Sequence, residues 1–321
     1  MKKFLWRHKK KVVGLVFLFI ISAGFCVAWA SSSPSDFPRG SIVRINKNVT
    51  IDGAASYLKE KGIVRYAFLY KTYVLMMRRD ASILAGSYLF DKPESALRVA
   101  YRTVYGINNL QKIKITFREG LNSKEIGALL KKNIPSFDVA TFLIEAKKNE
   151  GYLFPETYFF NPDVEPGEVI AEMRQQFDEK TVALIGALAT STRSFKDIVI
   201  MASILEEEAN NSADRTIISG VLWKRIDTNM PLQVDVPFYY IFDKTSPDLT
   251  RTELATTSPY NTYKNKGLPI GPISNPGLSS LRAALYPGTN PYFFYLADSK
   301  GVTHYSVNHD GHVVNIRKYL R

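Results

Sequence analysis

The first long pattern along the chain is an apolar run from Val12 to Ala30 that contains no charged side chain. A helix that crosses a bilayer needs about 20 consecutive apolar residues, so this run predicts a transmembrane helix. Basic residues precede it in segment 1–11, and positive charge stays on the cytoplasmic side of a membrane. We therefore expect a cytoplasmic tail over residues 1–11, one membrane-spanning helix over 12–30, and the bulk of the chain outside the cytoplasm.

A cleavable signal peptide is the alternative interpretation of this segment. Ala28-Trp29-Ala30 fits an A-x-A cleavage pattern, and small residues follow it. We favour a retained anchor, because the run is longer than the apolar part of a signal peptide and Trp29 suits the membrane interface. Either interpretation exports the bulk of the chain, so we expect no cofactor and no dependence on ATP.

The pattern changes after a Ser- and Pro-rich linker at residues 31–40. Residues 113–117 alternate between apolar and polar, as in a strand, and the apolar positions of 126–130 share one helix face. Asn122 is placed to cap that helix. Segment 112–133 therefore predicts a strand–turn–helix module, and short strands and helices along the chain predict an α+β fold.

Residues 258–277 concentrate Pro, Gly, Asn and Tyr without an apolar period. Such a segment is either a long ordered binding loop or a disordered linker. Its tyrosines and Asn261 favour the ordered loop, because linkers contain few aromatic residues.

Three consecutive glutamates end an apolar helical pattern near residue 205. Ser194 and Asp197 have the spacing of a capping box, which predicts that the helix begins there. Glu207 falls opposite the apolar stripe, towards solvent, whereas Glu206 and Glu208 flank its two edges. Partial burial raises the pKa of a carboxylic acid and lets it donate a proton near neutral pH. The pattern also fits edge glutamates that simply reach into water. It does not show whether Glu206 or Glu208 faces a cleft.

Charge and composition narrow the functional classes. The chain has a formal charge of +12, but segment 1–11 holds six of the basic residues and no acid, and the rest is only mildly basic. We therefore expect no nucleic-acid partner. The single cysteine, Cys26, lies in the apolar run, and the four histidines lack metal-ligand spacing, so we expect no metal site.

Several long motifs resemble those of the YceG-like family of membrane-anchored endolytic murein transglycosylases. Residues 202–235, ASILEEEANNSADRTIISGVLWKRIDTNMPLQVD, resemble its Glu-x-Glu signature, and residues 150–158, EGYLFPETY, resemble a second motif. Residues 258–277, SPYNTYKNKGLPIGPISNPG, resemble a third. AGSYLF and FREGLNSKEIGALL resemble its N-terminal lobe, whose second part is LysM-like. The motifs occur in the family's order, and the resemblance covers essentially the whole chain.

The resemblance implies an enzyme that cuts nascent peptidoglycan glycan strands internally, between N-acetylmuramic acid and N-acetylglucosamine, and leaves 1,6-anhydro ends. It implies an N-terminal lobe at 41–135, with the LysM-like module at about 112–135, and a catalytic domain at 136–321. The expected location is the bacterial cytoplasmic membrane, crossed once. The expected partners are glycan strands, the membrane and, by the family alone, cell-wall synthases.

The resemblance also assigns the site. The first glutamate of Glu-x-Glu is catalytic in the family, which here is Glu206, acting as general acid and then as general base. Glu156 either lines the cleft wall or holds the fold by hydrogen bonds, and we favour the latter. Loop structure is the alternative role for most of the expected substrate-binding or supporting residues, which are Glu208, Gln233, Asp235, Asn261 and Tyr263.

This sequence departs from the family pattern at two places, after Asp235 and at the C-terminal histidines, so we give these histidines little weight as catalytic residues. Val236 stands between Asp235 and Pro237, where the family often has proline at once, and His304 lies one position away from a common histidine. Tyr305 and His312 keep the expected spacing. Two other hypotheses stay open from the sequence: a non-catalytic peptidoglycan-binding scaffold, and a hydrolase on the same scaffold.

Overall fold

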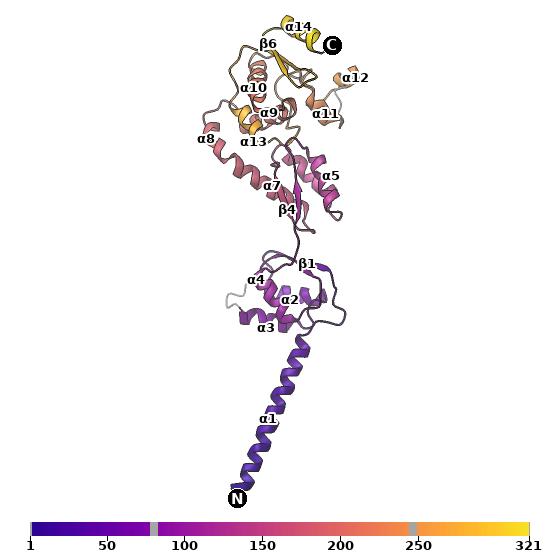
Figure 1. Cartoon of the computed structure of the whole chain (residues 1–321), viewed down its shortest axis with the longest axis vertical. Helices are drawn as coiled ribbons and strands as arrows, with labels where there is room; N and C mark the ends of the chain where they lie inside the picture. Colours follow the sequence, from indigo (N-terminus) through magenta and orange to yellow (C-terminus); the bar gives the residue numbers. More distant parts are fainter. Residues whose placement is uncertain (1, 78–82, 244–248, 321) are drawn as a thin grey trace. The chain divides into compact units, whose positions relative to one another are not determined.

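The computed structural model describes residues 2–77, 83–243 and 249–320, which form the mixed α+β fold that the sequence predicted (Figure 1). The chain divides into two compact units. Unit 1 comprises Met1–Lys112 with Asn161–Asp163, and unit 2 comprises Ile113–Phe160 with Val164–Arg321. The module expected at 112–135 thus packs within unit 2, while the functional domain boundaries drawn from the sequence stay predictions.

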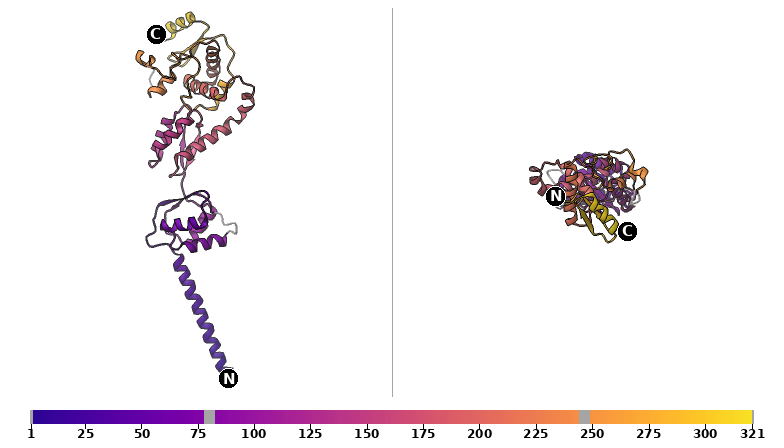
Figure 2. Two further views of the ribbon diagram at one scale, coloured as in Figure 1. Left: turned by 180° about the vertical axis from the view of Figure 1, so that it is seen from behind. Right: turned by 90° about the horizontal axis from the view of Figure 1, so that it is seen from above.

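Unit 1 begins with α1 (Lys2–Ser31), a single unbroken helix in both Figure 1 and the left view of Figure 2. Its stretch Val13–Ser31 is long and apolar enough to cross a membrane, as the sequence predicted, although a signal sequence meets the same criteria. The side chains from Val13 to Trp29 are all exposed. No part of the described chain therefore covers the apolar side chains of this helix, which water solvates poorly.

The rest of unit 1 is a two-stranded antiparallel sheet packed with three helices around one apolar core. Thr50 and Ser95 cap α2 and α4, and Gly106 ends α4 in the left-handed conformation at φ 71°. The elements are β1 (Ser41–Ile45), α2 (Ile51–Glu60), α3 (Ala67–Met77), β2 (Gly86–Phe90) and α4 (Ala96–Tyr105).

A buried ion pair holds the end of this sheet to α4. Arg102 is fully buried, and its Nη1 lies 2.9 Å from Oε1 of the nearly buried Glu94. Its other N–H groups donate to the carbonyl oxygens of Leu89, Ile107 and Asn108. The guanidinium thereby satisfies three backbone acceptors as well as one carboxylate.

Unit 2 opens with a strand–turn–helix module, as the alternation predicted. β3 (Ile113–Thr116) pairs antiparallel with β4 (Thr157–Phe160), and α5 (Ser123–Asn133) follows β3. The predicted cap is confirmed, because the Asn122 side chain accepts from Lys124 and Glu125 N–H. α6 (Val139–Ala146), η1 (Lys147–Asn149) and α7 (Pro166–Thr181) complete this part, with a core of its own.

The second half of unit 2 is built around α9 (Phe195–Glu208), which packs against α10 (Ser212–Asp227) and α13 (Leu278–Leu285). Segment 258–277 contains no helix or strand, yet Asn261, Thr262, Ser274 and Asn275 are all buried, which agrees with the ordered loop. The remaining elements are η2 (Val182–Leu184), α8 (Ile185–Leu188), α11 (Val236–Phe242), α12 (Arg251–Leu254), β5 (Phe294–Ala297), β6 (Thr303–Ser306) and α14 (His309–Tyr319).

Replacing Arg102 with methionine will destabilise unit 1 strongly, because Glu94 and three carbonyl groups lose their buried donor. Removing one partner of a buried ion pair costs about 3–5 kcal/mol of folding free energy. Urea unfolding of the full chain, followed by circular dichroism, measures the change. Arg98→Met, at an exposed position of the same helix, is the matched control and will change stability far less. Equal effects of the two variants would contradict this role for Arg102.

Candidate active site

The three glutamates stand where α9 leaves the protein core. The predicted capping box is confirmed: Ser194 accepts from Asp197 N–H, and the Asp197 carboxylate accepts from Ser194. The predicted one-sided apolar stripe is wrong, because all eight residues of Ile198–Leu205 are buried. The helix is enclosed on every side, so helical periodicity does not decide which glutamate faces a cavity.

Glu206 is held by two charge-stabilising contacts. Its side chain is only 4% exposed, and its Oε1 lies 2.5 Å from Nη2 of Arg215 on α10. Its Oε2 accepts a 2.8 Å hydrogen bond from the backbone N–H of Gly277, just before α13. Both donors stabilise the ionised carboxylate.

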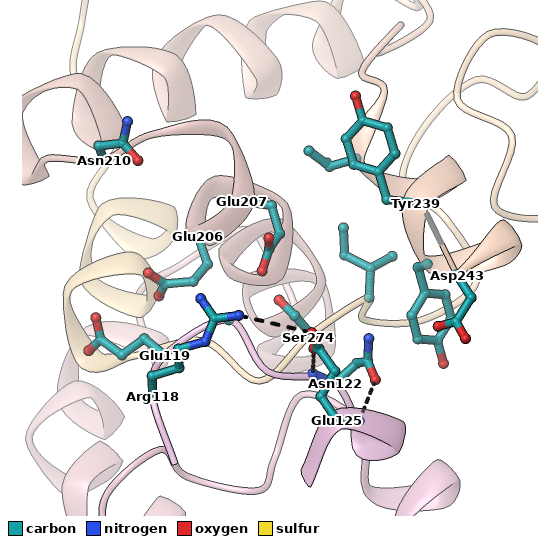
Figure 3. Close-up of a pocket in the computed structure, with 14 residues that line it drawn as sticks. Arg118, Glu119, Asn122, Glu125, Glu206, Glu207, Asn210, Tyr239, Asp243 and Ser274 are labelled. Atoms are coloured by element: carbon teal, nitrogen blue, oxygen red, sulfur yellow. Dashed lines mark hydrogen bonds and ion pairs between the residues drawn. The ribbon is translucent and has the colours of Figure 1, made fainter. Parts of the chain in front are cut away.

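The carboxylate lies at the wall of an open pocket of about 460 Å³ (Figure 3). The lining comes from four parts of unit 2: the turn between β3 and α5, the end of α9, helix α11, and loop residues Ile273 and Ser274. Carboxylates, amides and hydroxyls dominate it. The labelled lining side chains are Arg118, Glu119, Asn122, Glu125, Glu206, Glu207, Asn210, Tyr239, Asp243 and Ser274. A pocket of this kind offers hydrogen-bonding groups to a polar ligand.

Glu119 brings a second carboxyl group to the same wall. In Figure 3 it lies beside Glu206, on the turn that also carries Arg118. A Cβ atom at Gly277 would come within 1.7 Å of Glu119 Oε1, so only glycine at 277 leaves room for this carboxyl. Burial and the charge of Glu206 raise the pKa of Glu119, and Arg215 opposes that shift. The two carboxyls therefore contact the same glycine and interact electrically with the same arginine.

Glu207 faces this pocket, although the sequence pattern pointed it to solvent. Its side chain is exposed, but its Oε1 would lie 2.6 Å from a Cβ at Gly120, where φ is 83°. Burial of the carboxyl raises its pKa to about 7, with help from the charges of Glu125 and Glu206 and against a hydrogen bond with Ser274. Glu207 therefore holds its proton close to neutral pH.

Glu208 points away from the pocket into a buried polar network. It accepts a 2.9 Å hydrogen bond from the hydroxyl of Tyr295 on β5. Burial raises its pKa to about 7; the Tyr295 hydrogen bond and Arg225 oppose this shift, and Asp235 adds to it. It lies outside the pocket lining, so its contacts support the fold around the site.

The other predicted site residues gather in a neighbouring group, outside the lining of this pocket. One backbone hydrogen bond, from Gln233 N–H to the Thr262 carbonyl, joins segment 233–234 to residue 262. The Thr262 hydroxyl adds two more, because it accepts from Val234 N–H and donates to the Val234 carbonyl. Tyr263 donates to Asp235 over 2.6 Å, and Gln233 is exposed with a left-handed φ of 50°. Asn261 is fully buried and organises its own loop: it donates to two carbonyls and accepts from two N–H groups.

Two residues of the 150–158 motif have different places. Glu150, which the sequence did not single out, is buried and accepts from Ser123 N–H, Asn275 and Tyr240. Glu156 is exposed and forms a 3.1 Å ion pair with Lys180, outside the pocket. Glu150 is thus the buried centre of this motif, and Glu156 makes only a surface contact.

The C-terminal histidines stay away from the glutamates. His304 lies 2.9 Å from Asp298 and stacks on Tyr319, while His312 stacks on Phe294. Within residues 2–77, 83–243 and 249–320, no cluster of three or more His, Cys, Asp or Glu side chains could hold a metal ion.

Glu206 and Glu119 lie side by side at the wall of an open polar pocket, and Arg215 pairs with Glu206. This arrangement in an α+β unit defines a candidate acid–base site. The chain belongs to the YceG-like family, whose profile matches residues 43–318. This confirms the resemblance read from the motifs.

Named relatives agree with this assignment. A Bacillus subtilis (strain 168) protein named endolytic murein transglycosylase is 30% identical over 311 residues, which is 88% of this chain and 86% of that protein. A Streptococcus pneumoniae (serotype 2, strain D39) protein of the same name is 28% identical over 177 residues, 53% of this chain but only 32% of the pneumococcal protein. A crystal structure of a YceG-like protein from Listeria monocytogenes matches 86% of this chain and 99% of its own, with 28% identity and a TM-score of 0.59.

Replacing Glu207 with glutamine will stabilise the protein above pH 7 and change little near pH 5. The pKa of this carboxyl is about 7 in the folded chain against 4.5 as an ordinary glutamate, so folding loses stability as pH rises between these values. Melting temperatures at pH 5 and pH 8 test this. Glu156→Gln is the control of opposite sign, since hydrogen bonds from Thr157 and Lys180 lower that pKa. A Glu207→Gln effect that is independent of pH would contradict the prediction.

Proposed function

We propose that this protein is an endolytic peptidoglycan transglycosylase in which Glu206 is the catalytic acid and base. The observation that carries the proposal is the carboxylate of Glu206 at the wall of an open polar pocket, held by Arg215 and Gly277. The names of the Bacillus and pneumococcal relatives support the reaction class. The substrate would be the glycan strand of peptidoglycan.

One carboxyl suffices for this reaction. Protonated Glu206 gives its proton to the glycosidic oxygen as the bond to C1 of N-acetylmuramic acid breaks. The C6 hydroxyl oxygen of the same sugar attacks C1, and the carboxylate of Glu206 takes the hydroxyl proton. The product is a 1,6-anhydro end. Hydrolytic glycosidases commonly use two carboxyl groups, whereas an intramolecular nucleophile needs no activated water and gains a large proximity advantage.

The contacts of Glu206 fit the second half of this cycle, because Arg215 and the Gly277 N–H stabilise a carboxylate. The first half requires a proton at the same place. Glu119 has the raised pKa and touches Gly277 from the other side. Two adjacent carboxyls share protons as a pair. Within this proposal, Glu119 keeps a proton available to Glu206 until the glycosidic oxygen takes it.

The location and the accessory module complete the proposal. α1 would anchor the protein in the bacterial cytoplasmic membrane, with residues 1–11 in the cytoplasm and both units outside. The LysM-like module at about 112–135 would help to form the substrate cleft, since Arg118, Glu119 and Asn122 line the pocket. The family alone suggests cell-wall synthases as partners. Two alternatives remain: a non-catalytic peptidoglycan-binding scaffold and a hydrolase.

Replacing Glu206 with glutamine will lower the release of 1,6-anhydro ends from purified glycan strands by about 10²–10⁴-fold, the usual contribution of a general acid or base. Mass spectrometry of the cut ends measures this. Glu179→Gln, an exposed glutamate on α7, is the control and will cut like the wild type. Undiminished anhydro ends from Glu206→Gln would refute its role. Reducing ends that carry oxygen from labelled water would identify a hydrolase, and no cutting by the wild type would favour a scaffold.

Replacing Glu119 with glutamine will move the falling, high-pH limb of the activity profile to lower pH. The reason is that the variant removes the carboxyl whose pKa is raised by burial and by the charge of Glu206, and with it the proton that Glu119 supplies at higher pH. Rates measured across the pH range test this, with Glu119→Asp as the conservative rescue. Gly277→Ala will act in the same direction, because its methyl group displaces the Glu119 carboxyl. A uniform loss of rate at every pH would show that Glu119 has only a structural role.

A further inference from the structure

Helix α3 has more apolar surface than unit 1 can bury. Its sequence, AFLYKTYVLMM, contains only one charged residue, and the core covers Leu69, Tyr70 and Val74 on one side. On the opposite side Phe68 is 62% exposed, Leu75 46% and Met76 78%. A helix that is apolar all round is ordinarily enclosed by protein or by lipid.

The exposed residues form one continuous face. Phe68, Thr72, Leu75 and Met76 are spaced by four, three and one positions, so they lie on one side of the helix, here called the α3 face. Thr72 adds little polarity, because its hydroxyl donates to the Phe68 carbonyl. The one charged side chain, Lys71, is turned to Asp52 in a 2.5 Å ion pair. The α3 face is therefore uncharged as well as apolar.

The end of α1 is attached directly to α3. The hydroxyls of Ser31 and Tyr73 share a 2.6 Å hydrogen bond. The Arg65 guanidinium, from the turn before α3, lies 4.7 Å from the Trp29 ring centre and donates to the Ser33 carbonyl. Ala30 packs on the core of unit 1. Figure 1 shows α3 at the side of unit 1 where α1 ends.

We propose that the α3 face lies in the outer interface of the membrane that α1 spans, and that lipid is what covers it. This inference rests on the proposed anchor. If Val13–Ser31 crosses the bilayer, Trp29 and Ser31 mark its outer surface, and the hydrogen bond to Tyr73 holds α3 at that level. Tryptophan at the end of a spanning helix is typical of that interface, and so are helices with an apolar face and a nearby cation.

The consequence is that unit 1 has two attachments to the bilayer. A single spanning helix leaves the attached unit free to tilt, whereas a second, interfacial helix fixes which side of the unit faces the membrane. In this proposal unit 1 holds a fixed orientation on the membrane surface, in addition to linking α1 to unit 2.

The native Cys26 provides an internal reference for the test, because it lies within α1 and is exposed to its surroundings. The full chain is placed in nanodiscs of equal parts phosphatidylcholine and phosphatidylglycerol. Lipids with a nitroxide at the headgroup or deep in the acyl chain quench a fluorescent probe on a single cysteine. Probe sites are Cys26 itself and, with Cys26→Ser, Phe68→Cys, Met76→Cys and Lys47→Cys. Lys47 is exposed in the turn after β1 and serves as the matched control.

We expect nitroxide lipids to quench the probes at 26, 68 and 76 and not the probe at 47, and we expect the shallow nitroxide to quench the probes at 68 and 76 more strongly than the deep one. An interfacial helix buries its apolar face about 5–10 Å into the headgroup boundary, which is the depth that the shallow nitroxide reports. If 26 is quenched while 68 and 76 behave like 47, the α3 inference is overturned and a protein partner for that face is indicated. If 26 itself is not quenched, the proposed anchor fails, and the inference fails with it.

Discussion

The ion pair between Glu206 and Arg215 offsets part of the negative charge that three consecutive glutamates bring to the end of α9. Three carboxyl groups stand in the last turn of α9, where the helix dipole already places partial negative charge and no basic residue of the helix offsets it. Each is accommodated differently. Arg215 and the Gly277 N–H neutralise Glu206, Glu207 keeps a proton to about pH 7, and Glu208 accepts from Tyr295. Local rules are broken where a site is built, and contacts from elsewhere in the fold compensate.

The site also depends on a buried polar connection between distant parts of unit 2. Asn275 exchanges backbone hydrogen bonds with Gly120 and Leu121, and its side chain donates to Glu150. Glu150 in turn accepts from the first N–H of α5. Because Gly277 follows Asn275 by two residues, this connection sets the turn that carries Glu119 against the donor of Glu206. The Glu150 carboxylate and the Asn275 amide are both hydrogen-bonded inside the protein, which makes such a connection specific.

Unit 1 has more apolar side chains than its own core can bury. A complete core and a buried ion pair stabilise its interior, while α1 and the α3 face remain exposed next to each other. Exposed apolar patches of this kind mark interaction surfaces, and the membrane contact that we propose would cover both. The candidate site therefore belongs to unit 2, and the exposed apolar surface belongs to unit 1.

The sequence alone determined the features that depend on neighbouring residues. These include the apolar length of α1, the caps at Asn122 and Ser194, and the order of short strands and helices. The motifs also identified the family and selected Glu206 by resemblance. In each case the information is local, because a cap, a periodicity or a motif is complete within one stretch of chain.

Only the tertiary structure decided which side chains meet. Periodicity pointed Glu207 to solvent, and its side chain is exposed, but the fold also brings it against the turn bearing Gly120 and into the lining of the pocket. Arg215, Glu119 and Gly277 reach Glu206 from three separate elements, and no local spacing encodes their approach. For Asn261 the sequence left substrate binding and loop structure open, and the structure shows its side chain buried and hydrogen-bonded within its own loop. Packing between segments that are distant in the sequence determines which side chains contact each other, and local sequence patterns do not contain that information.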